Sequence, residues 1–504
     1  MRRFFLLMIS VFWCAFFSAA HDKTPEKSLS GLTQSVAGMH RCSSGTNTHD
    51  TVHKNDIVEK EKIVVADSLQ QILNSTLQFI ASQQYQVNSA AGFKGEWPTV
   101  MKLTIRFPFL GGAKEYADAN CFTVTNIHNE LAEIYLSDTM AYSFLKPVVL
   151  SAYDALKNYR SGNGYNFWRL YPVRFSFSRF DTTLIMRQPM TYRLKSKFIK
   201  KAANVVNDAD DSSIGYYASL LHSNFDTSSL DYSLLASLYP YIDENRRYLH
   251  WYNAKNKDTR NTGAFMTWLG DEVATKYSSK FNTLLQNLTF YSPVSKGYPH
   301  LHKSYIPYGT NDVDAVVNAN VLFSLAKAKE TDSLRIISNA ASFVTEKFRK
   351  GNFKRATIYY PNRYHLHAVT ARAYMAGIEQ LNEAVDLLIA DIKRQQQKDG
   401  SFKSSRKLNR KDKIQSTVNA LYALLQVGDV QKYQTKEVIT KAFYYLMANM
   451  QADRNGFYYW SGGVFFSGGT VVKNYLHFKS DAYTTVMMCK CLQQMIEMKR
   501  KGIL

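Results

Sequence analysis

The chain has 504 residues, of which 45% are hydrophobic and 14% aromatic, with only 11 prolines. This composition is globular, is ample for a large core and excludes a disordered chain. The formal net charge of +21 favours anionic partners, such as acidic glycans or an anionic membrane surface. No nucleic-acid-binding signature accompanies the charge, so nucleic acid is not an expected partner.

The first 20 residues are typical of a secretory signal. Arg2 and Arg3 precede an apolar run from Phe4 to Phe17, and small residues follow at 18–20. Residues 21–65 are polar and lack periodicity, which predicts a flexible leader. We therefore expect a secreted or periplasmic protein. The four cysteines beyond the signal are too few for a disulfide scaffold, and Cys489 and Cys491 are expected to be buried thiols.

Helical periodicity begins near Ser68 and breaks at a Gly-aromatic turn over 92–98. Residues 99–109 alternate between apolar and polar, as in a short strand or an extended insert. Helices are predicted at 121–137 and 139–158. The stretch 161–240 is the least regular: YPVRFSFSRF from Tyr171 looks extended, and NDADDSS at 207–213 is interpreted as an acidic loop.

The second half of the chain is more regular. It predicts helices at 264–290, 312–329, 331–349, 365–379, 381–397, 414–427, 434–451 and 480–499. Short links between successive helices imply antiparallel neighbours. The whole of 66–504 is predicted to be one domain, with an irregular insertion at about 161–262.

Four of these helices begin with acidic, amide or His residues, and three segments place a Gly-aromatic turn after a Gln-rich helix end. Repeats of this kind predict helical hairpins stacked around a closed ring, an all-α α/α toroid. Such a ring gathers its helix starts at one mouth. We expect the functional site there.

The segments KRQQQKDGSF (393–402), NGFYYW (455–460) and SDAYTT (480–485) resemble the repeats of squalene and other terpene cyclases and of protein prenyltransferase beta subunits. Those families share the α/α-toroid fold. The resemblance covers 68–100 and 263–500, and it implies the same fold for this chain.

Prenyltransferase beta subunits hold zinc through an Asp-Gly-Cys before Tyr-x-x-Trp and through an Asp-x-Tyr-His. The matching positions in this chain are Asn455, Gly456 and Phe457 before Trp460, then Asp481, Tyr483 and Thr484. Phe457 and Thr484 cannot replace a thiolate and an imidazole as zinc ligands. The sequence therefore predicts no metal site and no cofactor.

Class II terpene cyclases protonate an alkene with an Asp-x-Asp-Asp, whose middle acid is made strong by its neighbours. Asp312-Val313-Asp314-Ala315 keeps two of these carboxylates and loses the third. Capping of a helix start explains one of the two acids. Asn318 lies one turn after Asp314 on the same face, which either lines a cavity or faces water.

Other candidate ligand-binding residues also lie around helix starts. Asp118, Asn120, Asn126 and His128 surround the start at 121, where a solvated helix end is the alternative. Asp481 and Tyr483 head the last helix, Asp481 being a candidate cap, and Trp460 is a candidate for stacking on a ligand.

A further cluster holds two histidines, His365 and His367, with Tyr360, Arg363 and Arg372 nearby. Histidines at i and i+2 point to different helix faces, so they are a poor metal pair. One of them can point inward and act as an acid or base.

Three functions remain open at this stage. A polysaccharide-lyase-like enzyme would act on an acidic glycan with Asn126, His128, His365, Tyr360 and Arg363. A terpene-cyclase-like enzyme or carrier would take an isoprenoid lipid, with Asp312 or Asp314 as the acid. A non-catalytic module would bind envelope glycans, lipid or protein.

Overall fold

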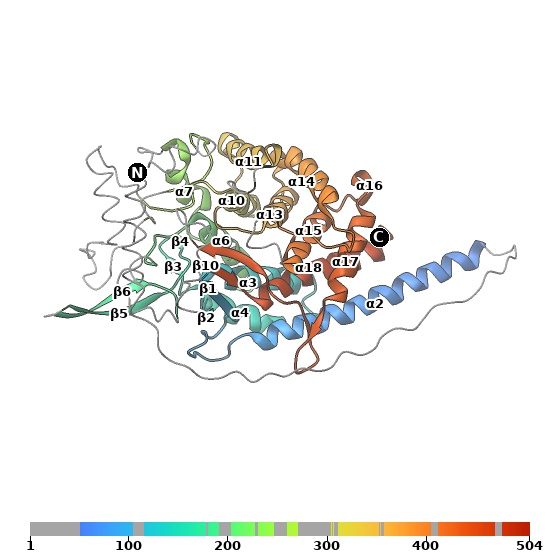
Figure 1. Cartoon of the computed structure of the whole chain (residues 1–504), viewed down its shortest axis with the longest axis horizontal. Helices are drawn as coiled ribbons and strands as arrows, with labels where there is room; N and C mark the ends of the chain where they lie inside the picture. Colours follow the sequence, from blue (N-terminus) through green and yellow to red (C-terminus); the bar gives the residue numbers. More distant parts are fainter. Residues whose placement is uncertain are drawn as a thin grey trace, which may run out of the picture.

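The computed structural model describes residues 51–103, 115–177, 180–190, 203–226, 230–245, 260–270, 304, 306, 311–351, 353, 357–404, 412–468 and 476–504. An inner ring of helices forms the centre of this part of the chain (Figure 1). It consists of α3 (Cys121–Ser137), α6 (Ala209–His222), α10 (Ala315–Ala328), α13 (Arg363–Met375), α15 (Lys413–Val427) and α18 (Asp481–Arg500). Each helix packs against the next in chain order, and α18 packs against α3, which closes the ring.

Outer helices cover this ring. They are α2 (Thr51–Gln83) on α18, α4 (Leu145–Leu156) on α3, α11 (Leu334–Arg349) on α10, α14 (Asn382–Gln395) on α11 and α13, and α17 (Lys436–Ala448) on α15. Two concentric layers of helices make an α/α toroid, so the predicted fold class is confirmed. One end of α2 extends beyond the ring in Figure 1.

Each inner helix begins after a short polar residue that caps it. The side chains of Asn120, Asp208, Asp314, Asn362, Asp412 and Ser480 each accept a hydrogen bond from a backbone N–H of the first turn. These N–H groups have no partner within the helix, so the caps stabilise the helix starts. The repeated polar heads seen in the sequence are therefore largely N-caps.

An antiparallel sheet joins the two ends of the ring domain. Its strand order is β2 (Glu115–Asp118), β1 (Thr99–Leu103), β10 (Leu476–Lys479) and β9 (Val464–Gly468). Met101 of β1 pairs with Phe478 of β10, and both are fully buried. Since β2 leads into α3 and β10 into α18, the sheet stands beside the starts of these two inner helices (Figure 1).

Short elements connect the layers. They are β3 (Arg160–Ser161), β4 (Gly164–Tyr165), β5 (Leu170–Phe177), β6 (Phe180–Arg187), α7 (Leu234–Leu238), η1 (Tyr239–Tyr241), η2 (Asp243–Asn245), η5 (Glu379–Leu381), α16 (Val430–Tyr433), β7 (Gln451–Ala452) and β8 (Tyr458–Tyr459). The extended conformation predicted from Tyr171 corresponds to β5, which pairs with β6 in a hairpin.

The sequence prediction is wrong in two places that matter for the site. Residues 207–213 are not a loop, because Asp208 caps α6 and Asp210 lies in its first turn. The helix predicted from 264 is also wrong over 264–270, where the backbone is extended and Thr267 N–H donates to the carbonyl of Asp312 at 2.8 Å. Residues 271–290 of that predicted helix lie outside the described residues.

The start of the domain also differs from the prediction. Helix α2 begins at Thr51, not near Ser68, so the end of the predicted leader is helical. The predicted signal at 1–20 lies outside the described residues. Over the described ranges, no helix combines the length and apolarity that a membrane crossing needs.

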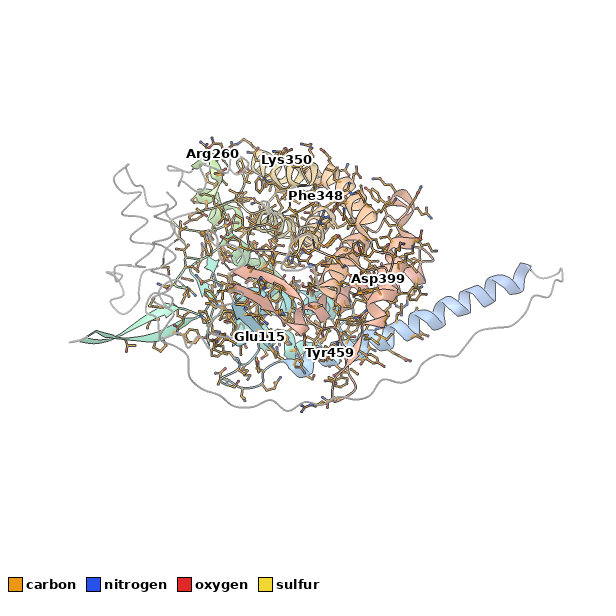
Figure 2. All side chains as sticks on the ribbon, viewed as in Figure 1. Glu115, Arg260, Phe348, Lys350, Asp399 and Tyr459 are labelled. Carbon is orange, nitrogen blue, oxygen red and sulfur yellow. The ribbon has the colours of Figure 1, made fainter. Side chains whose placement is uncertain are left out.

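Apolar side chains fill the space between the two helical layers. Cys489 and Cys491 are free and buried within α18, which confirms that expectation. Charged residues such as Lys350 and Asp399 are exposed on the outside of the ring (Figure 2).

Candidate active site

Three carboxylates gather at the start of α6, in the order Asp208-Ala209-Asp210-Asp211. Asp208 is the N-cap, and its Oδ1 accepts from the backbone N–H of Asp211 at 2.8 Å. All three side chains are buried. This is a complete Asp-x-Asp-Asp at the first turn of an inner helix, whereas residues 312–315 have only two acids.

Asp210, the middle acid, contacts two other elements of the ring. Its Oδ1 accepts from Asn320 Nδ2 of α10 at 2.7 Å, and its Oδ2 accepts from the Tyr360 hydroxyl. Burial and the adjacent Asp208 raise the pKa of Asp210 well above its usual range. The environment of Asp210 therefore favours its protonated form over the carboxylate.

The two flanking acids form a pair of their own. Burial raises the pKa of Asp208 to about 6, and burial together with the charge of Asp208 raises the pKa of Asp211 well above its usual range. Asp211 Oδ1 has no hydrogen-bond partner. The environment thus favours protonation within this group of acids, because three buried carboxylates this close cannot all ionise.

Aromatic rings surround the Tyr360 hydroxyl that reaches Asp210. The centroid of Tyr360 lies 5.7 Å from that of Phe122 and 5.6 Å from that of Phe466. Phe465 stacks on Phe122 at 5.7 Å and contacts Tyr483 at 4.5 Å. The start of α3, the strand β9 and the start of α18 therefore give the mouth of the ring an aromatic wall.

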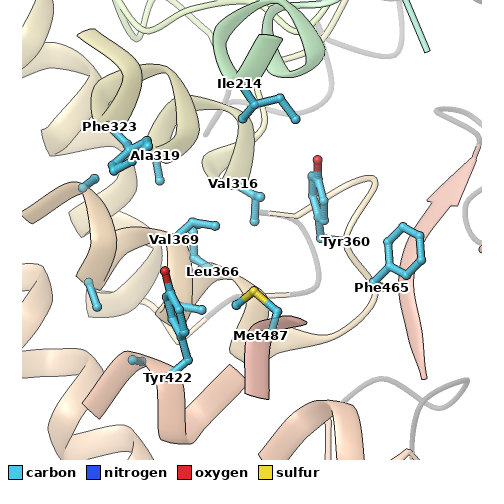
Figure 3. Packing of buried hydrophobic residues seen from close by; sticks show 14 of the residues in the cluster. Ile214, Val316, Ala319, Phe323, Tyr360, Leu366, Val369, Tyr422, Phe465 and Met487 are labelled. Atoms are coloured by element: carbon cyan, nitrogen blue, oxygen red, sulfur yellow. The ribbon is translucent and has the colours of Figure 1, made fainter. Parts of the chain in front are cut away.

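Below this wall the inner helices present apolar side chains to one another. Figure 3 shows Ile214, Val316, Leu366, Val369 and Met487 directed toward the middle of the ring. Val369 and Met487 are each 7% exposed, whereas the next residues along their helices, Thr370 and Met488, are fully buried. Both side chains are thus slightly less covered than their neighbours in the chain.

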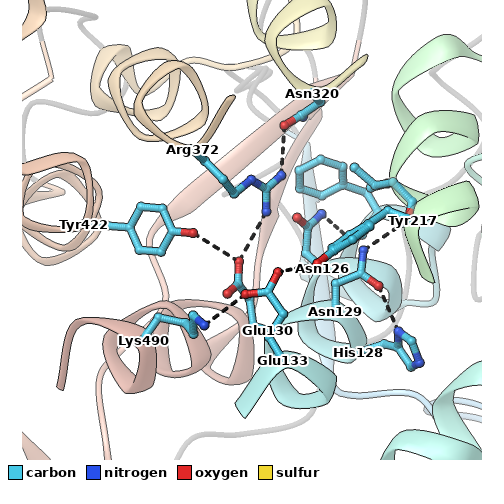
Figure 4. Close-up of polar contacts among 12 residues, drawn as sticks. Asn126, His128, Asn129, Glu130, Glu133, Tyr217, Asn320, Arg372, Tyr422 and Lys490 are labelled. Carbon is cyan, nitrogen blue, oxygen red and sulfur yellow. Dashed lines mark hydrogen bonds and ion pairs between the residues drawn. The ribbon is translucent and has the colours of Figure 1, made fainter. Parts of the chain in front are cut away.

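A charged network connects the inner helices within the ring (Figure 4). Arg372 Nη1 donates to Glu130 Oε1 at 3.2 Å, and its Nη2 donates to Asn320 Oδ1 at 3.1 Å. Lys490 Nζ lies 2.9 Å from Glu133 Oε2. Tyr217 and Tyr422 donate to Glu133 and Glu130, so every inner helix contributes a residue. Asn320 connects this network directly to Asp210.

His365 is a buried histidine at the mouth. Its ring centroid lies 4.6 Å from that of Tyr360, and its Nδ1 has no hydrogen-bond partner among the described residues. Burial, with a smaller contribution from the charge of Arg372, lowers the pKa of His365 to about 3. His365 is therefore a neutral imidazole with a free ring nitrogen, next to the tyrosine that contacts Asp210.

The two acids predicted from the sequence, Asp312 and Asp314, stabilise the backbone segments around the mouth of the ring. Asp312 accepts from the Thr267 hydroxyl at 2.6 Å and from the Tyr359 hydroxyl at 2.7 Å. Asp314 caps α10 and also accepts from the backbone N–H groups of Ile358 and Tyr359. Asn318 bonds both the N–H and the carbonyl of Phe265. Their hydrogen bonds fix the segments that precede α10 and α13.

The side chains of the predicted ligand-binding residues around the start of α3 point in two different directions. Asp118 accepts from Asn120 Nδ2 at 3.1 Å, and burial raises the pKa of Asp118 to about 7. Asn126 donates to the carbonyl of Phe122 at 2.8 Å. His128 Nδ1 bonds Asn129 at 2.8 Å, and its ring contacts Tyr153 of the outer helix α4. The side chain of His128 thus points away from the charged network, as Figure 4 also shows.

His367 and Arg363 also point outward. His367 Nε2 lies 2.9 Å and Arg363 Nη2 lies 2.5 Å from Asp391 Oδ2 of the outer helix α14. The structure therefore does not bring His128 and Arg363 together with His365 and Tyr360, as the lyase hypothesis requires.

The last predicted residues lie near β9 and α18. Trp460 is fully buried and donates from Nε1 to the carbonyl of Leu446 at 2.7 Å. Asp481 is exposed and accepts from the Gly462 N–H at 2.6 Å, while Ser480 is the cap of α18. Tyr483 belongs to the aromatic wall, and Arg372 to the charged network.

Sequence reasoning missed the acids at 208–211, and with them Asn320 and the charged network. A signal for the acids was present, because the letters DADD match Asp-x-Asp-Asp and precede the apolar IGYYASLL. Among the described residues, no group of three or more His, Cys, Asp or Glu side chains is arranged to hold a metal ion. A surface pocket lined by Gln70, Tyr142, Gln493 and Arg500 lies beside the ends of α3 and α18, away from these acids.

No family model matches the chain, and no curated protein matches it. Among solved structures, the type II terpene cyclase MstE from Scytonema is 13% identical, with a TM-score of 0.46 over 87% of this chain and 100% of that chain. Cellobiose 2-epimerase from Spirochaeta thermophila is 11% identical, with a TM-score of 0.43 over 89% of this chain and 99% of that chain. A protein from Actinoplanes is 12% identical, with a TM-score of 0.46 over 84% of this chain and 99% of that chain. Likeness at this level carries no argument about function.

Proposed function

We propose that this protein is a cyclase that protonates an isoprenoid alkene, with Asp210 as the acid. The observation that carries the proposal is the complete Asp-x-Asp-Asp at 208–211, buried at the start of an inner helix of an α/α toroid. This pattern is the one with which class II terpene cyclases protonate their substrates. Asp210 takes the place of Asp312 and Asp314 as the proposed acid. The side-chain oxygens of Asp312 and Asp314 already accept hydrogen bonds from the first turn of α10 and from neighbouring segments.

The surroundings of Asp210 suit an acid that acts on a hydrocarbon. Burial raises the pKa of Asp210 and so favours the protonated form, which carries the proton for the reaction. Once the proton has left, the carboxylate is stabilised by Asn320 Nδ2 and the Tyr360 hydroxyl, which already point at it. Because these two donors stabilise the ionised form of Asp210 more than the protonated form, they lower the barrier to proton transfer.

The reaction then proceeds without any other reagent. The alkene π pair takes the Asp210 proton to form a C–H bond, which leaves a carbocation on the neighbouring carbon. The π pair of a second alkene attacks this cation and closes a ring, moving the positive charge along the chain. The π systems of Phe122, Phe465 and Tyr483 in the aromatic wall would stabilise such a cation electrostatically.

Loss of a proton ends the reaction and restores an alkene. The neutral imidazole of His365, with its free Nδ1 beside Tyr360, is the base that we assign to this step. Return of that proton to the Asp210 carboxylate completes the cycle. The product is an isomer of the substrate.

The test is turnover of acyclic polyprenyl substrates (farnesol, geranylgeraniol and squalene), with products analysed by mass spectrometry in H2O and D2O. We expect cyclic isomers that carry one solvent deuterium in D2O, since the acid proton exchanges with solvent. Asp210→Asn should abolish turnover, whereas the exposed Asp399→Asn should not change it. Binding of these lipids without a cyclic product would overturn the proposal in favour of a non-catalytic lipid-binding protein.

A further inference from the structure

Arg187, the last residue of β6, is a buried arginine that forms no ion pair with any residue of the described ranges. It is only 4% exposed. Its Nη1 donates to the carbonyl of Trp168 at 2.8 Å, and the guanidinium has no other hydrogen bond within the described chain. No carboxylate of the described residues forms an ion pair with it. Burial lowers the pKa of Arg187 to about 10, so the group is still a cation at neutral pH.

Three other arginines of the described interior each form an ion pair. Arg169 pairs with Glu96, Arg363 with Asp391, and Arg372 with Glu130. Burying a charge is unfavourable unless a partner compensates it. Arg187 is therefore the exception among these four, and an anion from outside the protein would supply what it lacks.

Arg187 is linked to the proposed active site through two neighbouring segments. Its backbone N–H donates to Asn204 Oδ1 at 3.0 Å, on the segment that leads into α6. Its partner Trp168 follows Phe167, whose ring stacks on Phe466 of the aromatic wall at 4.8 Å. The charge of Arg187 is therefore held near the helix starts, on the side of the mouth formed by α3 and α6.

We propose that Arg187 binds the oxyanion at one end of the substrate, a carboxylate or a phosphate, while the isoprenoid chain of that substrate extends into the ring toward Asp210. This inference rests on the proposed function and narrows its substrate class to isoprenoids with an anionic end. A guanidinium is suited to the role because its N–H groups form a planar fork that matches carboxylate and phosphate oxygens. The net charge of +21 attracts such substrates to the protein.

The experiment compares three probes that share one chain: geranylgeraniol, geranylgeranoic acid and geranylgeranyl monophosphate. Affinity is measured by calorimetry with the full-length protein. We expect the wild type to bind at least one of the two anionic probes about 10-fold or more tightly than the alcohol. Whichever anion is preferred distinguishes a carboxylate from a phosphate ligand.

Two variants test whether Arg187 is responsible. Arg187→Gln should remove the preference for the anion, and Arg187→Lys should keep part of it. The exposed Arg335→Gln is the control and should behave as the wild type. Equal binding of alcohol and anions by the wild type, or an unchanged preference in Arg187→Gln, would overturn the inference. If Arg187→Gln does not fold, the wild-type comparison and Arg187→Lys still decide the matter.

Variants of Asp210 and Arg187 distinguish a failure of the anion site from a failure of the proposed cyclase activity. Asp210→Asn should lose turnover but keep the anion preference, because Asp210 does not take part in binding the oxyanion. Loss of the preference only in Arg187→Gln, with no cyclic product from any probe, would support the anion site and reject the cyclase. Cyclic products without any preference for the anionic probes would support the cyclase and reject the anion site.

Discussion

Asp210 and Tyr360 are 150 positions apart in the chain, and the hydroxyl of Tyr360 donates a hydrogen bond to the Asp210 carboxylate inside the ring. Asp210 lies in the first turn of α6, and Tyr360 lies just before α13. These helices are separated by α10, which sends Asn320 to the same carboxyl group. The acid is therefore held by three separate segments, and its surroundings are assembled only when α6, α10 and α13 pack side by side.

Replacing Tyr360 with Phe tests this relationship. The substitution removes one donor to the ionised form of Asp210, so the pKa of Asp210 should rise further and proton transfer should become harder. A hydrogen bond to a charged group is worth about 1.5–3 kcal/mol, so kcat should fall roughly 10- to 100-fold. Steady-state kinetics with the best polyprenyl substrate would measure the fall in kcat. The affinity for that substrate should stay within about 2-fold of the wild-type value, because the aromatic ring remains. A kcat equal to that of the wild type would show that Tyr360 does not assist the acid.

The sequence predicts much of the ring because periodicity is a local property. Helices expected at 121–137, 414–427 and 480–499 correspond closely to α3, α15 and α18. The polar heads of these helices are visible in the sequence, and most serve as caps. The start of α6 was missed because Asp and Ser are typical of loops, whereas in this ring Asp208 caps the helix and the following acids are buried.

The direction of a side chain is harder to predict than the position of its helix. His365 and His367 are two residues apart, and only His365 faces the interior, because His367 pairs with Asp391 of the outer helix α14. Asp391 follows His367 by 24 positions in the chain, and no local pattern links the two. Likewise, no sequence pattern shows that Arg187 forms no ion pair within the described ranges, since pairing depends on contacts made by the whole fold.

Asp412, the cap of α15, should make stability depend on pH. Burial raises the pKa of Asp412 to about 6, compared with about 3.9 in an unfolded chain. The folded state thus binds the proton more tightly, so this group favours folding below about pH 4 and the contribution is lost as the pH rises through 6.

Asp412→Asn should remove that dependence because Asn does not titrate, although its single side-chain oxygen accepts only one of the two backbone hydrogen bonds that the Asp412 oxygens accept from Gln415 and Val464. The free energy of unfolding of the variant, relative to the wild type, should increase by about 1–3 kcal/mol between pH 4 and pH 7. Urea unfolding at both pH values would measure it. Asp429→Asn, at the exposed cap of α16, is the control and should show no such change. Parallel stability curves for wild type and Asp412→Asn would contradict the argument.

The pair of Arg372 and Glu130 should be strongly coupled. Arg372→Met leaves the Glu130 carboxylate buried without its cationic partner, which should destabilise the fold by about 3–5 kcal/mol. Glu130→Gln in the same chain should recover much of the loss, because the uncompensated charge is then removed. A double-mutant cycle from denaturant unfolding measures the coupling. Additive effects of the two substitutions would show that the charges do not interact.

Phe465 should affect the chemistry as well as the stability. Phe465→Leu removes a ring that stacks on Phe122 at 5.7 Å and contacts Tyr483 at 4.5 Å, so the carbocation loses part of its aromatic wall. Both the aromatic contact and some buried area are lost, and the free energy of unfolding should fall by about 1–2 kcal/mol. Cyclisation should slow roughly 10-fold, and less fully cyclised products should accumulate, because the cation is then deprotonated earlier.

Phe402→Leu is the matched control for this prediction. Phe402 is also fully buried, and its ring packs against Tyr364, outside the aromatic wall. Its substitution should cost similar stability and leave the product profile unchanged. Product analysis by mass spectrometry, with thermal unfolding in parallel, separates the two effects. If Phe402→Leu altered the products as much as Phe465→Leu did, loss of stability would explain both, and the aromatic wall would have no special role in stabilising the cation.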